Sequence, residues 1–296
     1  MKPLDMMRIS VRHFLPTLTV GVAMASLLAA PRAMAVRPLK DSVGLQLYSL
    51  RNQFGKDVPK TLAEVRGWGV KYVELAGTYN LSPADFKAQL DANGLVPLSA
   101  HFSFEQWAAD PEAVLSQADA LGLKYVGCAW IPHEGKFDEA TCRKAIEVFN
   151  RAGEAAAKHK MKFFYHTHGY EFQPFEDGTL FDLLVKGTDP KNVKFEMDIF
   201  WIAHAGQDPV QLLAKYPKRF ELMHLKDMKK STPTGLLTGG TDVSNDAALG
   251  EGKLNLPAIL AEAHKIRVKW YFIEDESPVS ERQIPVSLRY LEDFSN

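Results

Sequence analysis

Residues 162–168, KFFYHTH, form a short run that begins apolar and ends in two histidines. Aromatic residues at 163–165 favour a buried β-strand. Side chains alternate along a strand, so His166 and His168 lie on the same side of the chain. A glutamate, Glu171, follows closely in the longer stretch KFFYHTHGYE (162–171). These residues fit a metal site, an acid/base site, or a strand end that is merely polar, and the rest of the chain has to distinguish them.

Seven further runs of this kind occur at a fairly regular pace, at 43–50, 72–77, 97–104, 124–131, 194–200, 219–226 and 270–276. Their β-branched and aromatic content is typical of buried parallel strands. Amphipathic stretches separate them, and a cap residue followed by proline begins three of these at Ser82-Pro83, Asp110-Pro111 and Asp208-Pro209. The longest, 138–158, carries one apolar stripe. The chain therefore alternates strands with helices.

Eight strand–helix units within residues 36–296 predict a single (β/α)8 TIM barrel, a fold that typically needs ~250 residues. A doubly wound open sheet is the alternative, but no glycine-rich phosphate fingerprint follows the first strand. No linker or low-complexity segment divides these residues, so we predict one domain, 36–296. The longest connection, 227–254, contains Gly239-Gly240. Loops of this length are usually functional or disordered, so we expect this one to act as a lid over the active site.

The first 35 residues differ in kind from the rest. Lys2, Arg8 and Arg12 precede an apolar stretch at 14–30, and Ala33-Met34-Ala35 fits a signal-peptidase site. We predict a secretory signal peptide at 1–35, with an uncleaved anchor as the alternative. The mature protein is expected to begin near Val36, to be periplasmic or secreted, and to lack stable membrane association after cleavage.

The formal net charge of −1 gives no electrostatic reason to expect nucleic acid or an anionic membrane as a partner. The two cysteines, Cys128 and Cys142, form no CxxC motif, and we expect two buried thiols. The composition leaves a homo-oligomer open.

Polar side chains gather at the carboxyl ends of the predicted strands, where TIM barrels carry their active sites. A lone polar strand end is often only solvated, but nearly every strand here has one. By alternation, the inward residues are Gln46, Tyr48, Glu74, Ser99, His101, His166, His168, Glu196, Asp198, His224, Lys226, Glu274 and Glu276. His204 is expected in a loop.

Asp198, His224 and Glu274 end three successive predicted strands and therefore converge. A mixed carboxylate and imidazole set suits one divalent ion such as Mn²⁺, Co²⁺, Zn²⁺ or Mg²⁺. Without a cation, two carboxylates this close would repel, and one would tend to stay protonated. We therefore predict a metal site on these three residues.

Five segments in order, YHTHGYEF, FEMDIFWIAHAGQDP, MHLKD, LGEGKLN and YFIEDE, resemble the sugar phosphate isomerase/epimerase family. This xylose isomerase-like TIM barrel group includes ketose 3-epimerases, inosose dehydratases and endonuclease IV. The resemblance covers essentially the whole chain after the predicted signal. It implies a metal held by Glu, Asp, His and Glu from strands five to eight, and Asp198, His224 and Glu274 match the last three. Glu276 is the alternative to Glu274.

The sequence differs from the family's pattern of metal ligands in the stretch 162–171. Where ketose epimerases carry a glutamate in strand five, this chain has Tyr165 or His166. We assign Glu171 as the fourth ligand, with His166 and His168 as alternatives. The endonuclease branch needs more metal-binding positions and a basic surface, so DNA repair is not expected.

The resemblance and the strand ends together predict a metal-dependent isomerase or epimerase that forms an enediolate from a keto-sugar. His166, His168, Glu274 and Lys226 are the predicted catalytic residues, and Glu74, His101 and Trp201 the predicted substrate-binding ones. The alternative for Lys226 is a purely structural role, in a salt bridge to Asp227 or Glu251. Export, and the absence of a phosphate-binding nest, favour a non-phosphorylated keto-sugar or 3-keto-glycoside. The alternatives are an inosose-type dehydratase and an inactive carbohydrate-binding barrel.

Overall fold

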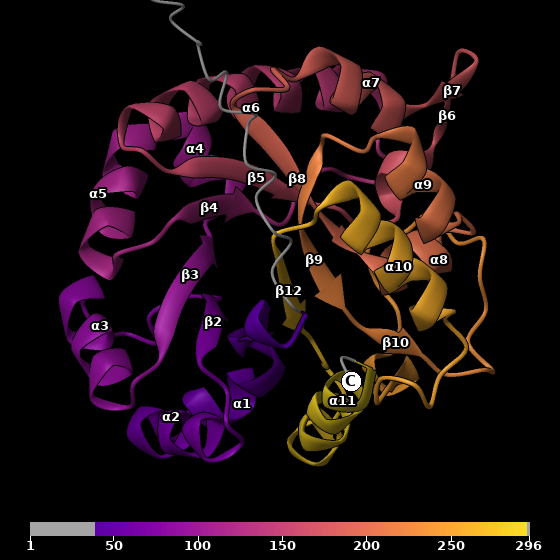
Figure 1. The fold of residues 1–296 in the computed structure, drawn as a ribbon. Coiled ribbons are helices and arrows are strands. Elements are labelled where there is room, and N and C mark those ends of the chain that lie inside the picture. The colour runs from indigo at the N-terminus through magenta and orange to yellow at the C-terminus, as the bar shows by residue number, and fades with distance from the viewer. Residues whose placement is uncertain (1–38, 295–296) are drawn as a thin grey trace, which may run out of the picture. The chain divides into compact units, whose positions relative to one another are not determined.

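The computed structural model describes residues 39–294, so the predicted signal peptide at 1–35 lies outside the described residues. Within the described part, eight parallel strands close into a barrel in the order β1-β12-β9-β8-β5-β4-β3-β2, with helices around it (Figure 1). The prediction of a (β/α)8 barrel is confirmed, and the open-sheet alternative is excluded.

All eight predicted strands are present, and each ends one to four residues earlier than predicted. The barrel strands are β1 (Val43–Gln46), β2 (Tyr72–Leu75), β3 (Val96–His101), β4 (Tyr125–Cys128), β5 (Lys162–His166), β8 (Val193–Asp198), β9 (Phe220–Leu225) and β12 (Trp270–Ile273). Two antiparallel pairs lie outside the barrel sheet: β6 (Pro174–Phe175) with β7 (Gly178–Thr179), and β10 (Asp227–Met228) with β11 (Asp246–Ala247).

The helices begin where the cap residues predict. Ser82, Asp110 and Asp208 each accept a hydrogen bond from a backbone N–H of the first turn, followed by proline. The α-helices are α1 (Arg51–Phe54), α2 (Val58–Gly67), α3 (Pro83–Ala92), α4 (Phe104–Ala109), α5 (Pro111–Leu121), α6 (Glu139–Lys158), α7 (Leu180–Gly187), α8 (Ile199–His204), α9 (Pro209–Lys215), α10 (Leu256–Ile266) and α11 (Ser280–Phe294). Short 3₁₀ turns are η1 (Leu39–Asp41), η2 (Leu47–Leu50), η3 (Tyr170–Phe172) and η4 (Val243–Asn245).

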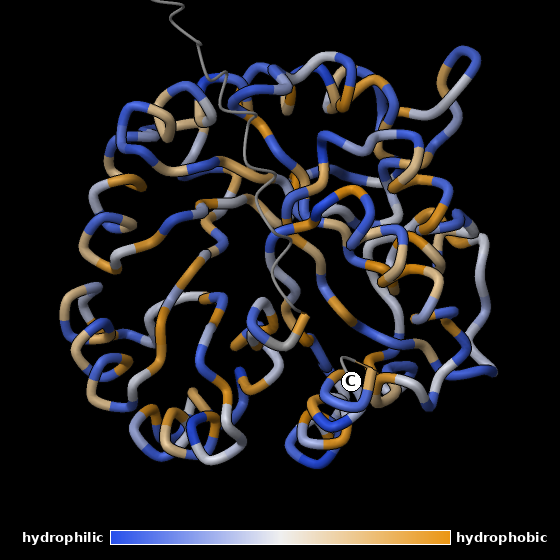
Figure 2. Tube along the Cα trace, in the orientation of Figure 1, coloured by the Kyte–Doolittle hydropathy of each residue, from blue (hydrophilic) through white to orange (hydrophobic). Residues whose placement is uncertain are grey.

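Apolar and polar residues alternate along the outer helices, as Figure 2 shows, because each helix packs one face on the barrel. The predicted stripe on α6 is a clear case: Phe149 is fully buried, and its ring packs at a tilt against the rings of Phe163 and Tyr165 of β5. One prediction was wrong here. His204 is not in a loop but ends α8 and is fully buried, because the Asp198 carboxylate caps a helix directly after β8.

An apolar layer lies below the polar strand ends. Phe164, Leu222 and Phe272 belong to one buried cluster, and each precedes by two positions a site residue in or directly after its own strand. Residues two positions apart in a strand have their side chains on the same face of the sheet. The apolar layer therefore supports the polar one, and the pairing of His166 with Glu196 and of Asp198 with His224 sets the polar layer's register.

Both cysteines are free and buried, as predicted. Across residues 39–294, no helix combines the length and the apolar character that crossing a membrane requires.

Candidate active site

A cavity of about 380 Å³ opens at the carboxyl ends of the barrel strands. This volume falls in the ~300–1,000 Å³ range of small-molecule sites. Its wall includes the predicted residues His101, His166, His168, Trp201, Lys226, Glu274 and Glu276, together with Tyr48, Ala76, Ala129, Trp130, Gly239, Gly240, Thr241, Val243 and Asp246. The long connection between β9 and α10 thus contributes part of the wall, in line with its predicted position over the site.

Asp198, His224 and Glu274 converge as the sequence predicts. Nδ1 of His224 lies 3.2 Å from Oε2 of Glu274 and 3.9 Å from Oδ2 of Asp198. Oδ1 of Asp198 accepts the N–H of Trp201 at 3.0 Å, whereas its buried Oδ2 has no hydrogen-bond partner among the described residues.

These three side chains fit a divalent ion. Ligand atoms of a tetrahedral ion lie about 2.1 Å from it and hence roughly 3.4 Å from one another. The candidate ligand atoms all lie within 4.8 Å of one another, and the unpaired oxygen of Asp198 is the kind of atom that a cation would satisfy. Burial is the main reason that the pKa of Asp198 is raised to about 7, and a cation would remove that cost.

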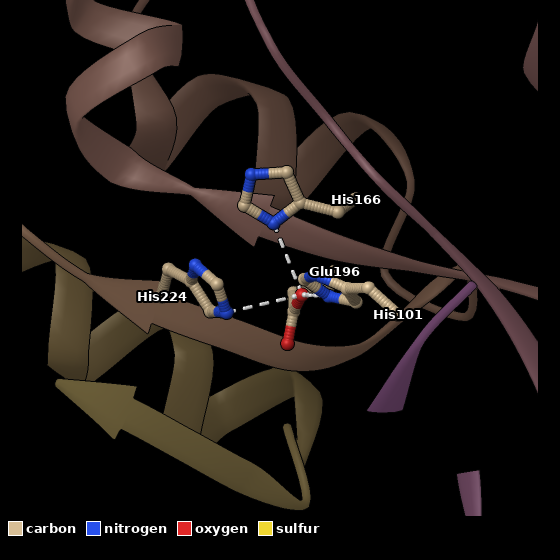
Figure 3. A group of neighbouring side chains, drawn as sticks. All are labelled: His101, His166, Glu196 and His224. Atoms are coloured by element: carbon tan, nitrogen blue, oxygen red, sulfur yellow. Dashed lines mark hydrogen bonds and ion pairs between the residues drawn. The ribbon is translucent and has the colours of Figure 1, made fainter. Parts of the chain in front are cut away.

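A second cluster surrounds Glu196, which the sequence placed inward but to which no role was assigned. Oε2 of Glu196 lies 3.0 Å from Nδ1 of His166, 3.1 Å from Nε2 of His101 and 3.2 Å from Nε2 of His224 (Figure 3). Burial, followed by the charge of Glu74, raises the pKa of Glu196 to about 7. Its position two residues before Asp198 on the same strand face was the available signal.

The structure does not bring Glu171 to the three candidate ligands. After β5, the turn η3 carries its carboxylate to the outer side of the strand, where Oε1 accepts bonds from the Tyr165 hydroxyl at 2.5 Å and the His168 N–H at 2.9 Å. Glu171 belongs to neither group of candidate ligands, whereas Nε2 of His166 lies 3.9 Å from Oδ2 of Asp198. Of the three alternatives for the fourth ligand, the geometry favours His166.

The predicted substrate residues fall into two groups. His101 and Trp201 line the cavity, but Glu74 is fully buried below it and is absent from the wall. Glu74 accepts hydrogen bonds from Gln46 at 2.6 Å and from Ser99 at 2.5 Å, and it lies 2.6 Å from Nε2 of His224. Its place in the structure is therefore to orient polar groups, not to contact a substrate.

Two histidines that face the cavity, His101 and His168, differ in their protonation state. Burial lowers the pKa of His168 to about 3, so its imidazole is neutral, and its Nδ1 has no hydrogen-bond partner among residues 39–294. Burial opposes the charge of His101 as well, but the carboxylates of Glu74 and Glu196 outweigh it and raise its pKa to about 9. The cavity thus holds a neutral imidazole and a protonated one.

Lys226 lies among three carboxylates. It contacts Glu276, and its Nζ lies 3.4 Å from Glu274 and 3.8 Å from Asp246. Burial opposes the charge, but the carboxylates hold the pKa of Lys226 well above its ordinary value. Asp227, one of its alternative partners from the sequence, instead accepts four backbone N–H groups, from Met228, Gly250, Gly252 and Leu254.

The family model described as xylose isomerase-like TIM barrel matches residues 62–294. The chain belongs to this family. A sugar phosphate isomerase/epimerase from Parabacteroides distasonis ATCC 8503 superposes on this xylose isomerase-like barrel with a TM-score of 0.70 and 25% identity, over 88% of this chain and 97% of that one. The IolI protein with a bound zinc atom shares the fold, with a TM-score of 0.66 and 16% identity over 85% and 95% of the two chains.

Among curated relatives, inosose dehydratase of Clostridium botulinum (strain Alaska E43 / Type E3) is 27% identical over 191 residues. That alignment spans 57% of this xylose isomerase-like chain and 63% of the dehydratase.

One wall residue of this xylose isomerase-like barrel was not singled out by the sequence. Trp130 lay within a predicted strand at 124–131, but β4 ends at Cys128, so the indole turns to the cavity mouth and is 43% exposed. Tyr48 is equally exposed at the same cavity, where the guanidinium of Arg51 lies 4.4 Å from its ring centroid. Because the predicted strand ran through Trp130, no feature of the sequence indicated its place at the cavity mouth.

Proposed function

We propose that this protein is a divalent-metal-dependent enzyme that removes a proton next to the carbonyl of a non-phosphorylated keto-sugar or 3-keto-glycoside, leading to isomerisation or epimerisation. The observation that carries the proposal is the buried Oδ2 of Asp198, which has no hydrogen-bond partner within residues 39–294 and lies beside His224 and Glu274. The adjoining cavity also exposes neutral His168. Membership of the xylose isomerase-like family supports it.

Asp198, His224 and Glu274 would hold the ion, with His166 nearest to complete the set. When bound, a divalent ion would polarise the substrate carbonyl and stabilise the negative charge of an enediolate. His168 suits a general base, because a neutral imidazole can accept the proton of the neighbouring C–H.

 The electrons of that C–H bond form a C=C double bond to the carbonyl carbon, and the π electrons of the carbonyl move onto its oxygen. Charged Lys226 can donate a hydrogen bond to this developing oxyanion. Return of the proton to the former carbonyl carbon, together with transfer of the neighbouring hydroxyl proton to the oxyanion, gives the isomer. Return of the proton to the opposite face of the original carbon gives the epimer.

A β-elimination is the second candidate. The curated relatives of this chain include inosose dehydratases. Elimination needs a base for one proton and an acid for the departing hydroxyl. Neutral His168 can serve as the base, and protonated His101 can serve as the acid. The carboxylates of Glu74 and Glu196 raise the pKa of His101 to about 9 despite its burial. The substrate would lose one proton and one hydroxyl as water, without change of oxidation state. The product distinguishes this reaction from isomerisation.

The test begins with metal analysis of the purified protein and a panel of keto-sugars in deuterated water, with label incorporation read by mass spectrometry. We expect one divalent ion per chain and deuterium next to the carbonyl. Asp198→Ala should lose both, whereas Asp208→Ala, which removes the cap of α9, should lose neither. Sugar binding without deuterium exchange would indicate an inactive carbohydrate-binding barrel. The proposal fails if the protein holds no metal and Asp198→Ala remains active.

We also propose export to the periplasm or the medium, which rests on the signal-like sequence of residues 1–35 alone. N-terminal sequencing of the secreted or periplasmic protein should begin near Val36. A membrane fraction that retains Met1 would favour the uncleaved anchor instead.

A further inference from the structure

A second, smaller cavity of about 230 Å³ adjoins the candidate active site. The two cavities share three residues, His101, Ala129 and Trp130. Beyond these, the second cavity is lined by Phe102, Ser103, Phe104 and Glu105, which lead from β3 into α4, and by Pro132. The binding space is therefore longer than the cavity around the candidate ligands, and the indole of Trp130 lies where its two parts meet.

Trp130 is held in place although it is 43% exposed. Its ring stacks on His133 with centroids 5.2 Å apart and meets the edge of Tyr170 at 4.8 Å. The Tyr170 hydroxyl in turn accepts the N–H of Ile131 at 2.9 Å, which fixes the backbone next to the indole. Gly239 packs so closely that a Cβ there would overlap the indole. A large apolar ring is thus kept rigid and partly open to solvent.

Such a ring offers a flat apolar surface at little cost in conformational entropy when a ligand binds. The C–H face of a sugar ring can cover it, while the hydroxyls point to the sides. Ser103 and Glu105 are exposed at the second cavity and add a hydroxyl and a carboxylate to its wall. This combination suits a hydroxylated ring better than a purely aromatic group.

We propose that the second cavity binds a second sugar ring, so that the substrate is a keto-glycoside with two rings and not a free keto-monosaccharide. This inference rests on the proposed function for the placement of the reacting ring beside Asp198, His224 and Glu274. Trp130 is then a specificity-determining residue, which contacts the ring that does not react.

Calorimetric titration of the metal-loaded protein tests the inference with probes that cannot react. The probes are three glucose disaccharides (trehalose, maltose and cellobiose) and methyl glucoside. At least one disaccharide should bind more tightly than methyl glucoside. Trp130→Ala should weaken that disaccharide by about two- to twelvefold, the range expected for loss of one aromatic contact. It should weaken methyl glucoside less, because Trp130 lies at the border of the first cavity but forms a main wall of the second. Trp130→Phe should retain most of the preference.

Two further variants keep the test decisive. Phe294→Ala removes a ring of similar exposure, 41%, from α11, where it lines neither of these two cavities, and should change neither affinity. Glu105 lines the second cavity and not the first, so Glu105→Ala should weaken binding of the disaccharide alone. This variant tests the second cavity even if Trp130→Ala fails to fold.

The inference is overturned if the wild type does not prefer a disaccharide, or if Trp130→Ala weakens both classes of probe equally. A disaccharide preference that depends on Trp130, without deuterium exchange on either keto-sugars or two-ring keto-glycosides, would refute the proposed function and leave the second sugar-binding site standing.

Discussion

Nε2 of His224 lies 2.6 Å from Oε1 of Glu74, a carboxylate that is fully buried below the cavity. This contact occupies one ring nitrogen and leaves Nδ1 directed to Asp198 and Glu274. A histidine that gives its other N–H to a carboxylate is held in one tautomer and is a stronger metal ligand. Glu74 is therefore a positioning residue for His224 in the proposed metal site.

Glu74→Gln should lower the affinity for a divalent ion by about 10- to 100-fold, because the amide keeps the shape but loses the charge that supports His224. Competition with a fluorescent chelator measures the change. Ser99→Ala is the matched control, since Ser99 donates to the same carboxylate at 2.5 Å without contacting His224. Equal metal affinity in wild type and Glu74→Gln would refute the positioning role.

The fold could be predicted because its signals are local. A cap residue before proline, as at Ser82, favours the start of a helix, and strand alternation fixes which side chains face inward. Alternation also brought Asp198, His224 and Glu274 together correctly, since all three lie in or directly after a barrel strand.

The remainder of the site depends on geometry beyond the strand ends, where alternation no longer holds. A 3₁₀ turn carries Glu171 to the outer side of β5, and an immediate helix buries His204. Trp130 reaches the cavity mouth because β4 stops two residues earlier. Turns of this kind depend on contacts with distant segments, such as the bond from Ile131 to Tyr170, which the sequence alone does not reveal.

Glu171→Gln should retain the bound metal, because the carboxylate lies against Tyr165 and the His168 N–H and not with the candidate ligands. Metal analysis of the purified variant measures this. The variant should also lower kcat, since the contact with the His168 backbone positions the proposed base. Loss of the metal with an intact fold would instead restore Glu171 as a ligand.

Glu171 also predicts a dependence of stability on pH. Burial raises its pKa from 4.5 to about 7, so the folded state binds more protons than the unfolded state between these values. Stability contributed by the protonated form is present below pH 4.5 and is lost as the pH rises through 7, by up to about 3 kcal/mol. Glu171→Gln stays neutral, so its melting temperature should gain on that of the wild type from pH 5 to pH 7.5. Glu154→Gln, on the exposed face of α6, should track the wild type, and parallel curves for all three would contradict the prediction.

His168 should remain neutral between pH 5 and pH 8. Burial lowers its pKa to about 3, so its ring should not titrate between pH 5 and 8 in the NMR spectrum of histidine-labelled protein. His168→Ala assigns the signal and should lower kcat by about 10²- to 10⁴-fold without loss of metal, as removal of a general base does. His159→Ala, on the surface between Glu112 and Asp119, is the control and should leave kcat unchanged. A His168 signal that titrates near pH 6.5 would contradict this account.

Gly252→Ala should destabilise the protein through Asp227. The Asp227 carboxylate accepts backbone N–H groups from Gly250 at 3.0 Å and Gly252 at 3.1 Å, which holds the end of the long connection against β10. A Cβ at Gly252 would overlap Oδ1 of Asp227, so the carboxylate or the loop must move, at a cost of about 1–3 kcal/mol.

Gly67→Ala at the end of α2 is the matched control, because a Cβ there meets no atom within 4 Å. Thermal melts should show a drop of about 2–10 °C for Gly252→Ala and almost none for Gly67→Ala. Equal melting temperatures would mean that the loop adapts without loss, and that Asp227 does not determine its conformation.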